Sequence, residues 1–316
     1  MLLRNFFIFI LISFAIISCE KEITVDLPSP KDQIVVEGFI ENDVPPYVFL
    51  TKNSPYFGTV DINDLDQYYV KGAKIVVSSG EDSVELMEYS ASIINLLPEE
   101  EKRKLSAYFG VPLDTSLNFP NISVYTIPLD ANFVGVIGKT YNLRIEAEGK
   151  VLTATTYIPH SVGLNELSVR PHPDPKYDTL VELRAMLQDP DTLGNFYRYF
   201  TRKNSEPYTL INNSVFDDLI FNGKNFPIGI PYGFERNSTE DFDFNTFGYW
   251  NKKDTCYVKF CVIDRPHYDF WRTLENELNN QGSPFGSFTR IRTNINGGLG
   301  IWGGYSSTLS VYYPQE

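Results

Sequence analysis

Histidine is the side chain best suited to acid–base catalysis and metal binding near neutral pH, and it is scarce in this sequence. The three histidines are His160, His172 and His267, and none has a partner at the spacing of a metal site. The H-E-x-x-H motif of metalloproteases and the G-x-S-x-G motif of serine hydrolases are both absent from the sequence. We therefore predict no catalytic residue and no enzymatic activity. A carboxylate pair for glycoside hydrolysis stays open, because 40 acidic residues offer many pairs of unknown separation.

Two further motifs suggest ligands but lack the context that those ligands need. Residues 298–303 match the dinucleotide pattern G-x-G-x-x-G, but a strand-like run follows them where a helix should begin. We expect these glycines to allow a turn or bulge beside Trp302. Acidic clusters starting at Asp61, Asp189 and Asp241 all lack the ligand order of an EF-hand loop. We predict no metal and no cofactor, although an irregular calcium site built from separate loops stays open.

An aromatic-rich segment offers the remaining candidate contacts. Tyr232, Phe234, Tyr249 and Trp250 lie in a stretch that also contains glycine and asparagine. Such rings could stack on a sugar, hold a peptide or insert into a receptor, so we take these four residues as candidate partner or ligand contacts. The alternative is that the rings pack beneath long loops as a small core of their own.

The overall composition favours a folded β-rich protein with an acidic surface. The chain has 316 residues and a net charge of −13, which argues against nucleic acid as a partner because phosphate binding requires clustered lysine and arginine. Aromatic residues make up 15% of the chain, and 20 prolines and 21 glycines accompany them. This combination is typical of short strands joined by many turns.

The N-terminus has the features of a lipoprotein signal peptide. The apolar run from Phe6 to Ile17 would span about 18 Å as a helix, which is too short for a hydrocarbon core of ~30 Å. Ser18-Cys19 at its end resembles a bacterial lipobox, so we predict a signal peptide over residues 1–18 and lipidation of Cys19. Residues 19–33 would then form the tether to the membrane. An ordinary signal peptide with an incidental cysteine is the alternative.

The mature chain reads as a series of strands in two halves. We predict two antiparallel, immunoglobulin-like β-sandwich domains, residues 34–161 and 162–316, with one or two short helices. Alternating or β-branched runs predict strands at 34–40, 47–51, 73–79, 83–89, 180–189, 195–202, 256–263, 287–295 and 306–313. Alternation over 140–158, with a turn at Glu148-Gly149, predicts a hairpin.

The helix signals lie at 98–109 and 265–279. In the second helix, Asp264 is a plausible N-cap, and Phe270, Trp271, Leu274 and Leu278 form one apolar stripe that we expect to pack on the core. Cys256 and Cys261 fall on one predicted strand at a spacing that sends them to opposite faces. We therefore expect two buried thiols and no disulfide between them.

Several blocks of the sequence together resemble a known family. The blocks are CEKEITVDLP, IVVEGFI, PYVFLTKNSPYF and VKGAKIVVSS in the first half, and DPDTLGNFYRYF, FDDLIFNGK, HYDFWRTLENE and TNINGGLGIWGGYS in the second. In this order they resemble the Bacteroidetes lipoproteins grouped as domain of unknown function 4249. The acidic Glu20-Lys21-Glu22 after the cysteine also resembles the surface-export signal of such lipoproteins.

The resemblance implies a lipid-anchored outer-membrane protein that faces the cell surface. It also implies a TonB-dependent outer-membrane receptor as partner, and it assigns no catalytic residue. We therefore expect a non-enzymatic accessory that helps such a receptor to capture or take up a nutrient. The alternatives are a surface hydrolase acting on glycan or peptide, and a structural or adhesive protein of the cell envelope.

Overall fold

The computed structural model describes residues 33–53, 67–90, 123–128, 130–211, 213–233, 243–280 and 289–314. These residues belong to one compact unit, Asp32–Glu316. The signal peptide, Cys19, the tether, Phe234 and the helix expected at 98–109 lie outside the described residues, and so does most of the acidic cluster that begins at Asp61.

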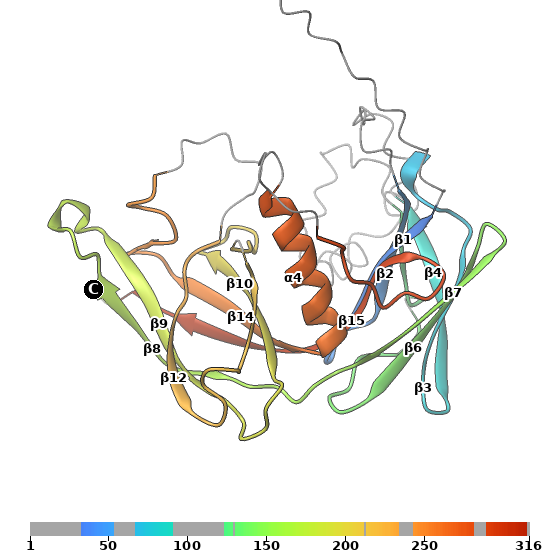
Figure 1. Cartoon of the computed structure of the whole chain (residues 1–316), viewed down its shortest axis with the longest axis horizontal. Helices are drawn as coiled ribbons and strands as arrows, with labels where there is room; N and C mark the ends of the chain where they lie inside the picture. The colour runs from blue at the N-terminus through green and yellow to red at the C-terminus, as the bar shows by residue number, and fades with distance from the viewer. Residues whose placement is uncertain are drawn as a thin grey trace, which may run out of the picture. The chain divides into compact units, whose positions relative to one another are not determined.

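The described strands form one large sheet and one small sheet (Figure 1). The large sheet has the strand order β11-β10-β14-β15-β1-β2-β5-β4-β3-β6-β7. Its strands are β1 (Ile34–Glu41), β2 (Tyr47–Lys52), β3 (Lys74–Ser79), β4 (Asp82–Ser90), β5 (Ser123–Thr126), β6 (Thr140–Ala147), β7 (Lys150–Tyr157), β10 (Phe196–Lys203), β11 (Val215–Asp217), β14 (Cys256–Ile263) and β15 (Leu299–Tyr312). Neighbours pair antiparallel except β1 and β15, which run parallel.

The small sheet is built around β9 (Leu180–Gln188). It pairs antiparallel with β8 (Leu164–Pro171), β12 (Asn225–Gly229) and β13 (Trp250–Asn251). Alternate residues of β9 are buried, among them Leu183 and Leu187, which pack with Tyr197 of β10 and Phe260 of β14. A core therefore lies between the small sheet and the β10–β14 part of the large sheet.

The structure confirms a mainly β protein. It does not confirm the pair of immunoglobulin-like sandwiches, because strands from both halves of the chain share a single open sheet through the β1–β15 pair. The boundary between domains near residue 162 stays a prediction. β8 begins just after that position and pairs with β9 of the small sheet.

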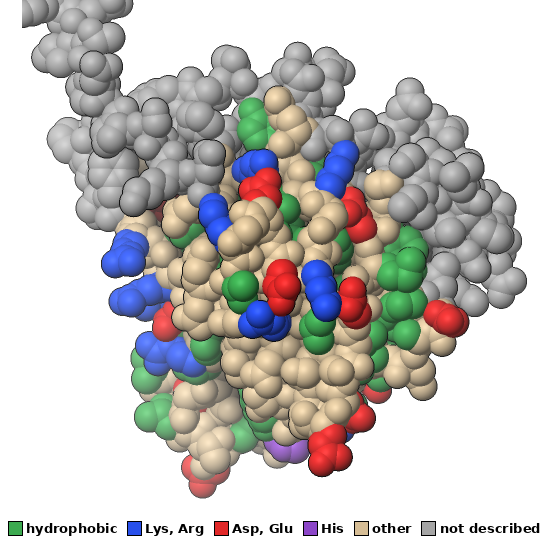
Figure 2. Space-filling view, turned by 90° about the vertical axis from the view of Figure 1, so that its right-hand side faces the viewer, with side chains coloured by type: hydrophobic (Ala, Val, Ile, Leu, Met, Phe, Trp, Pro, Cys, Tyr) green, Lys and Arg blue, Asp and Glu red, His purple; other side chains and the backbone are tan. Residues whose placement is uncertain are grey.

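The predicted hairpin is confirmed as β6 and β7. Leu143 and Ile145 point into the core, while Arg144 and Glu146 lie on the outer face and form an ion pair of 2.9 Å. Figure 2 views this side of the molecule and shows basic and acidic side chains occurring together on it. Glu148 and Gly149 in the turn have φ of 49° and 72°, as a two-residue hairpin turn requires.

The two cysteines on β14 are free and buried, as expected. Cys256 packs in the core below the small sheet, and Cys261 packs in the core between the large sheet and the helix. Burial raises the pKa of both thiols to about 12, which makes them poor nucleophiles at neutral pH.

The second predicted helix is α4 (Arg265–Asn280), and its N-cap is also confirmed. The Asp264 carboxylate accepts a hydrogen bond of 3.0 Å from the backbone nitrogen of His267, three residues on. The predicted apolar stripe is only partly correct, because Leu278 is 37% exposed. The helix instead buries His267 and Glu275 against the sheet. The sequence prediction counted only apolar residues, so it did not identify these two polar residues as buried.

The strand predicted at 287–295 is wrong for the residues that the structure describes there, 289–295, which form no strand. The reason is that a side chain in this segment makes the hydrogen bonds that the backbone of a paired strand would make. The Asn294 amide accepts a hydrogen bond of 2.9 Å from the Trp302 backbone nitrogen and donates one of 2.7 Å to the Trp302 carbonyl. Asn294 therefore satisfies the edge of β15 that faces away from β1, at a point that the pairing with β14 does not reach.

The glycines at 298–303 serve close packing of strands. They lie just before and within β15, with no helix following, so the phosphate-binding context is absent. Gly300 has a φ of 100°, and a Cβ there would overlap the carbonyl oxygen of Val36 on β1. The parallel pairing of β1 with β15 thus requires a residue without a side chain at this position.

We predict that Gly300→Ala lowers the free energy of unfolding by roughly 3 kcal/mol or more, because it combines backbone strain with a backbone clash. Urea denaturation followed by tryptophan fluorescence measures this change. Gly163→Ala is the matched control, since Gly163 is exposed and a Cβ there meets no atom within 4 Å. Equal unfolding midpoints for the two variants would contradict the prediction.

Candidate ligand-binding pocket

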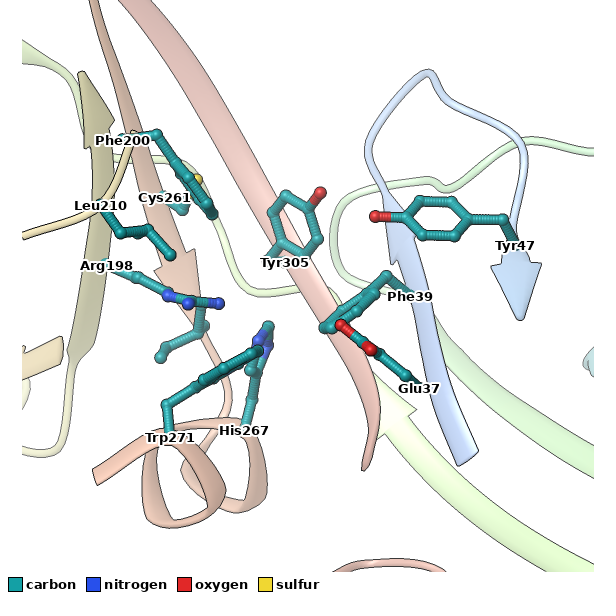
Figure 3. Close-up of a pocket in the computed structure, with 11 residues that line it drawn as sticks. Glu37, Phe39, Tyr47, Arg198, Phe200, Leu210, Cys261, His267, Trp271 and Tyr305 are labelled. Atoms are coloured by element: carbon teal, nitrogen blue, oxygen red, sulfur yellow. The ribbon is translucent and has the colours of Figure 1, made fainter. Parts of the chain in front are cut away.

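A pocket of about 190 Å³ lies between α4 and the large sheet (Figure 3). It collects side chains from five strands (β1, β2, β10, β14 and β15) and from the helix. Most of its lining is apolar or aromatic, contributed by Phe39, Tyr47, Phe200, Ile263, Trp271 and Tyr305. Arg198 on β10, Glu37 on β1 and His267 on α4 bring a guanidinium, a carboxylate and an imidazole into it. An apolar enclosure with a few polar groups is typical of a small-molecule site.

Arg198 is the central charge of the pocket and is only 4% exposed. Its Nε donates a hydrogen bond of 3.0 Å to the Ser214 hydroxyl. That hydroxyl donates in turn to one oxygen of Glu275, at 2.6 Å, and the Ser214 backbone nitrogen donates to the other, at 2.8 Å. Burial lowers the pKa of Arg198 to about 10, so the guanidinium still carries its charge at neutral pH.

The flat faces of the Arg198 guanidinium are supported by aromatic rings. Its central carbon lies 3.7 Å from the centroid of the Trp271 ring and 5.0 Å from that of Phe200. This stacking fixes the plane of the guanidinium. The terminal Nη2 is nevertheless buried with no hydrogen-bond partner among the described residues, and the same holds for Nε1 of Trp271. A buried charged donor without a partner is costly, and a ligand that supplies an acceptor removes that cost.

His267 presents an unpartnered acceptor in the pocket. Its side chain is 1% exposed, and Nδ1 lies 3.5 Å from the carbonyl oxygen of Gly304, which can only accept a hydrogen bond. We therefore assign the proton to Nδ1, which leaves Nε2 as an acceptor. Nε2 is buried with no partner in the described part of the chain. Burial and the nearby Arg198 lower the pKa of His267 to about 3, so the ring is neutral near pH 7.

Glu37 lies on the side of the pocket opposite Arg198, and its carboxylate points toward the same space in Figure 3. The side chain is open to solvent at the pocket mouth. Loss of hydration next to the surrounding protein raises the pKa of the Glu37 carboxyl above its ordinary value. The positive charge of Arg198 offsets part of this rise. The charges of the pocket therefore stand at two ends of an otherwise apolar space.

A third carboxylate near the pocket is already satisfied. Glu41 forms an ion pair of 2.6 Å with Lys259 and accepts a hydrogen bond of 2.9 Å from the Tyr305 hydroxyl. It also accepts a hydrogen bond from the Ser307 hydroxyl. With these partners Glu41 holds β1, β14 and β15 together, so we assign it a structural role.

Of the aromatic residues predicted from the sequence, the three that the structure describes do not line this pocket. Trp250 is 1% exposed, and its indole nitrogen donates a hydrogen bond of 2.8 Å to the Ile230 carbonyl. Tyr232 packs on Trp250 at 5.1 Å and donates from its hydroxyl to Glu206. Tyr249 packs on His172 at 4.4 Å. These three residues thus have packing partners within the protein, and Trp250 and Tyr232 belong to the core below the small sheet. Their contact with a ligand or partner stays a prediction, as does that of Phe234.

The sequence did contain a signal for Arg198 that motif searches miss. The run FYRYF places a charged residue between aromatic residues in a predicted strand, and burial on both faces of β10 makes that charge unusual. For Glu37 and His267 the sequence alone gives no comparable signal. Both are polar residues on a strand or helix, and only the folded structure shows which other side chains lie next to them.

The acidic clusters weighed for calcium have structural partners where they are described. Asp189 accepts hydrogen bonds from the Tyr197 hydroxyl and the Gly223 backbone nitrogen. Asp243 accepts from the backbone and side chain of Asn245.

Within the described ranges, no helix has the length and apolar character to cross a membrane.

The sequence matches one family model over most of its length. The model, Domain of unknown function (DUF4249), covers residues 20–310. The chain belongs to this family. The match to DUF4249 confirms the resemblance seen in the sequence blocks, and it includes all three polar groups of the pocket. The family description names no activity, and comparison with curated proteins finds no match.

The buried, neutral His267 predicts a specific loss of stability in acid. Below pH 6.5 the unfolded chain binds a proton at this residue, while the folded protein does so only near pH 3. The free energy of unfolding should therefore fall by up to about 1.4 kcal/mol per pH unit as the pH drops below 6.5. Urea unfolding of the wild type and His267→Asn between pH 7 and pH 4 measures this contribution as the difference between the two slopes.

The comparison isolates His267 because Arg198 stays charged over this range, and Glu37 titrates in both proteins. His160→Asn is the control, since His160 is exposed. Parallel pH profiles for the wild type and His267→Asn would contradict the assignment of a buried neutral imidazole.

Proposed function

We propose that this protein is a non-enzymatic outer-membrane lipoprotein that binds a small anionic ligand in the Arg198 pocket. In this proposal it is anchored by lipid on Cys19, faces the cell surface and assists a TonB-dependent receptor in nutrient capture. The signal-peptide features of residues 1–18 support the anchor, and the family resemblance supports the receptor. The pocket supplies a reason for a capture role.

The observation that carries the binding role is the unpartnered nitrogen of Arg198. The guanidinium is buried, oriented by Ser214 and stacked on Trp271, yet its Nη2 meets no acceptor among the described residues. A side chain fixed in this way binds an anion without losing further conformational freedom, and this preorganisation favours affinity.

The same geometry favours binding over hydrolysis. A histidine with a pKa of about 3 is a weak general base at neutral pH, and no carboxylate among the described residues forms a hydrogen bond with the imidazole ring of His267. The Ser214 hydroxyl is committed to Glu275 and accepts from Arg198, so it is not an activated nucleophile. The alternative of a surface hydrolase therefore draws no support from this pocket.

We predict that benzoate binds the mature protein and that Arg198→Gln weakens this binding by about tenfold or more, because a charge-assisted hydrogen bond is lost. Benzoate matches both the aromatic walls and the guanidinium. Isothermal titration calorimetry at pH 7 measures the change. Arg144→Gln is the control, as Arg144 is exposed on β6 and pairs with Glu146. Equal affinity of the wild type and Arg198→Gln would refute an anion site at Arg198.

We also expect C-terminally tagged protein to recover a TonB-dependent receptor from detergent-solubilised outer membranes, at near-equal amounts by mass spectrometry. Cys19→Ala should lose the receptor, because the unlipidated protein is not held at the membrane. Recovery of the lipoprotein alone would argue against the accessory role and leave the binding site to be explained by another partner.

A further inference from the structure

We infer that the ligand of this pocket is a zwitterion, a free α-amino acid with an apolar side chain. Its carboxylate pairs with Arg198 and its ammonium group with Glu37. This inference rests on the proposed anion site and adds the class of the ligand. It follows from the arrangement of charges, hydrogen-bonding atoms and apolar walls.

The first argument is the charge balance of the pocket. Glu41 is paired with Lys259, and Glu275, which accepts from the backbone nitrogen and hydroxyl of Ser214, does not line the pocket. Arg198 and Glu37 are then the two charges that face the empty space, one of each sign. A ligand with only a negative charge would leave Glu37 opposed by like charge, whereas a zwitterion satisfies both ends.

The second argument is the position of Glu37. It lies on β1 with Phe39 and Glu41 on the same face, since alternate residues of a strand point the same way. Glu41 has three partners, whereas the Glu37 carboxylate forms no hydrogen bond or ion pair with another described residue. The Glu37 carboxylate faces Arg198 across the pocket but forms no ion pair with it. The space between the two charges can therefore hold a ligand whose ammonium group pairs with Glu37.

The third argument is His267, whose Nε2 is a buried acceptor without a partner among the described residues. A ligand carboxylate cannot donate to it, but an ammonium group can, because it has three protons. A simple anion therefore satisfies Arg198 and leaves His267 unpaired. A ligand that carries both an acceptor and a donor satisfies Nη2 of Arg198 and Nε2 of His267 together.

The fourth argument is size and surface. The pocket volume of about 190 Å³ is slightly larger than an engineered cavity of ~150 Å³ that holds benzene. One amino acid suits this volume and a longer peptide does not. Phe39, Trp271 and Ile263 give the remaining walls an apolar character that matches an aliphatic or aromatic side chain.

The test is a binding panel on the mature lipoprotein in detergent at pH 7. The twenty common amino acids are first screened by thermal shift, and L-leucine, N-acetyl-L-leucine and L-leucinamide are then titrated by calorimetry. The two derivatives remove the ammonium charge and the carboxylate charge in turn. We expect an apolar amino acid to bind, and each leucine derivative to bind at least about tenfold more weakly than leucine.

The variants separate the two ends of the ligand. Glu37→Gln should weaken leucine at least about tenfold but leave N-acetyl-leucine unchanged, and Arg198→Gln should weaken both. Arg198→Lys, which keeps the charge and loses the planar fork, guards against a folding defect and should retain part of the leucine affinity. Glu85→Gln, an exposed carboxylate on β4, is the matched control for Glu37.

The outcomes distinguish this inference from the proposed function. If N-acetyl-leucine or benzoate binds as tightly as leucine and Glu37→Gln has no effect, the anion site stands and the zwitterion is refuted. If none of the twenty amino acids binds while benzoate does, the inference is likewise overturned. If neither benzoate nor any amino acid depends on Arg198, both proposals fail.

Discussion

The parallel pairing of β1 with β15 is the constraint on which the rest of the structure depends. It joins a strand from the start of the described chain to a strand from its end, and every other neighbouring pair in the large sheet is antiparallel. Without this pair, the sheet would separate into two parts, β11-β10-β14-β15 and β1 to β7. Glycine makes the pairing possible, because Gly300 and Gly38 lie where side chains would meet the partner strand's backbone or Trp302.

This pairing also creates the pocket. β1 carries Glu37 and Phe39, β15 carries Tyr305, and α4 covers the face on which these side chains lie. Trp302, on the opposite face of β15, is fully buried and donates a hydrogen bond of 3.1 Å to the Tyr141 carbonyl on β6. One face of the β1–β15 pair thus anchors the core, and the other lines the site. Because such contacts join distant parts of the chain, we expect them to form late and slowly in folding.

The buried Arg198 illustrates how the protein uses an energetic cost. Removing a guanidinium from water is unfavourable, and the Ser214–Glu275 relay together with the Trp271 ring offsets only part of that penalty. The unpartnered nitrogen stays as a local source of instability, which an acceptor on a bound ligand would relieve. His267 carries a similar cost, but its unpartnered Nε2 is a hydrogen-bond acceptor instead of a donor. Two such atoms in one pocket are hard to explain by packing alone, because a wholly apolar lining would be more stable.

The sequence by itself determined the local structure and the family. Alternation specified β6 and β7, the Glu148-Gly149 turn specified their hairpin, and Asp264 specified the start of α4, because each depends on residues close in the chain. The alternation at 287–295 predicted a strand, but the described residues 289–295 form none. There the Asn294 side chain makes the hydrogen bonds to the Trp302 backbone that a neighbouring strand would otherwise make. Only the tertiary structure decided that both halves share one sheet and that Arg198, Glu37 and His267 face one space. The physical reason is that the cost of a buried charge, and the partner that relieves it, depend on strands and a helix far apart in sequence, which no local pattern encodes.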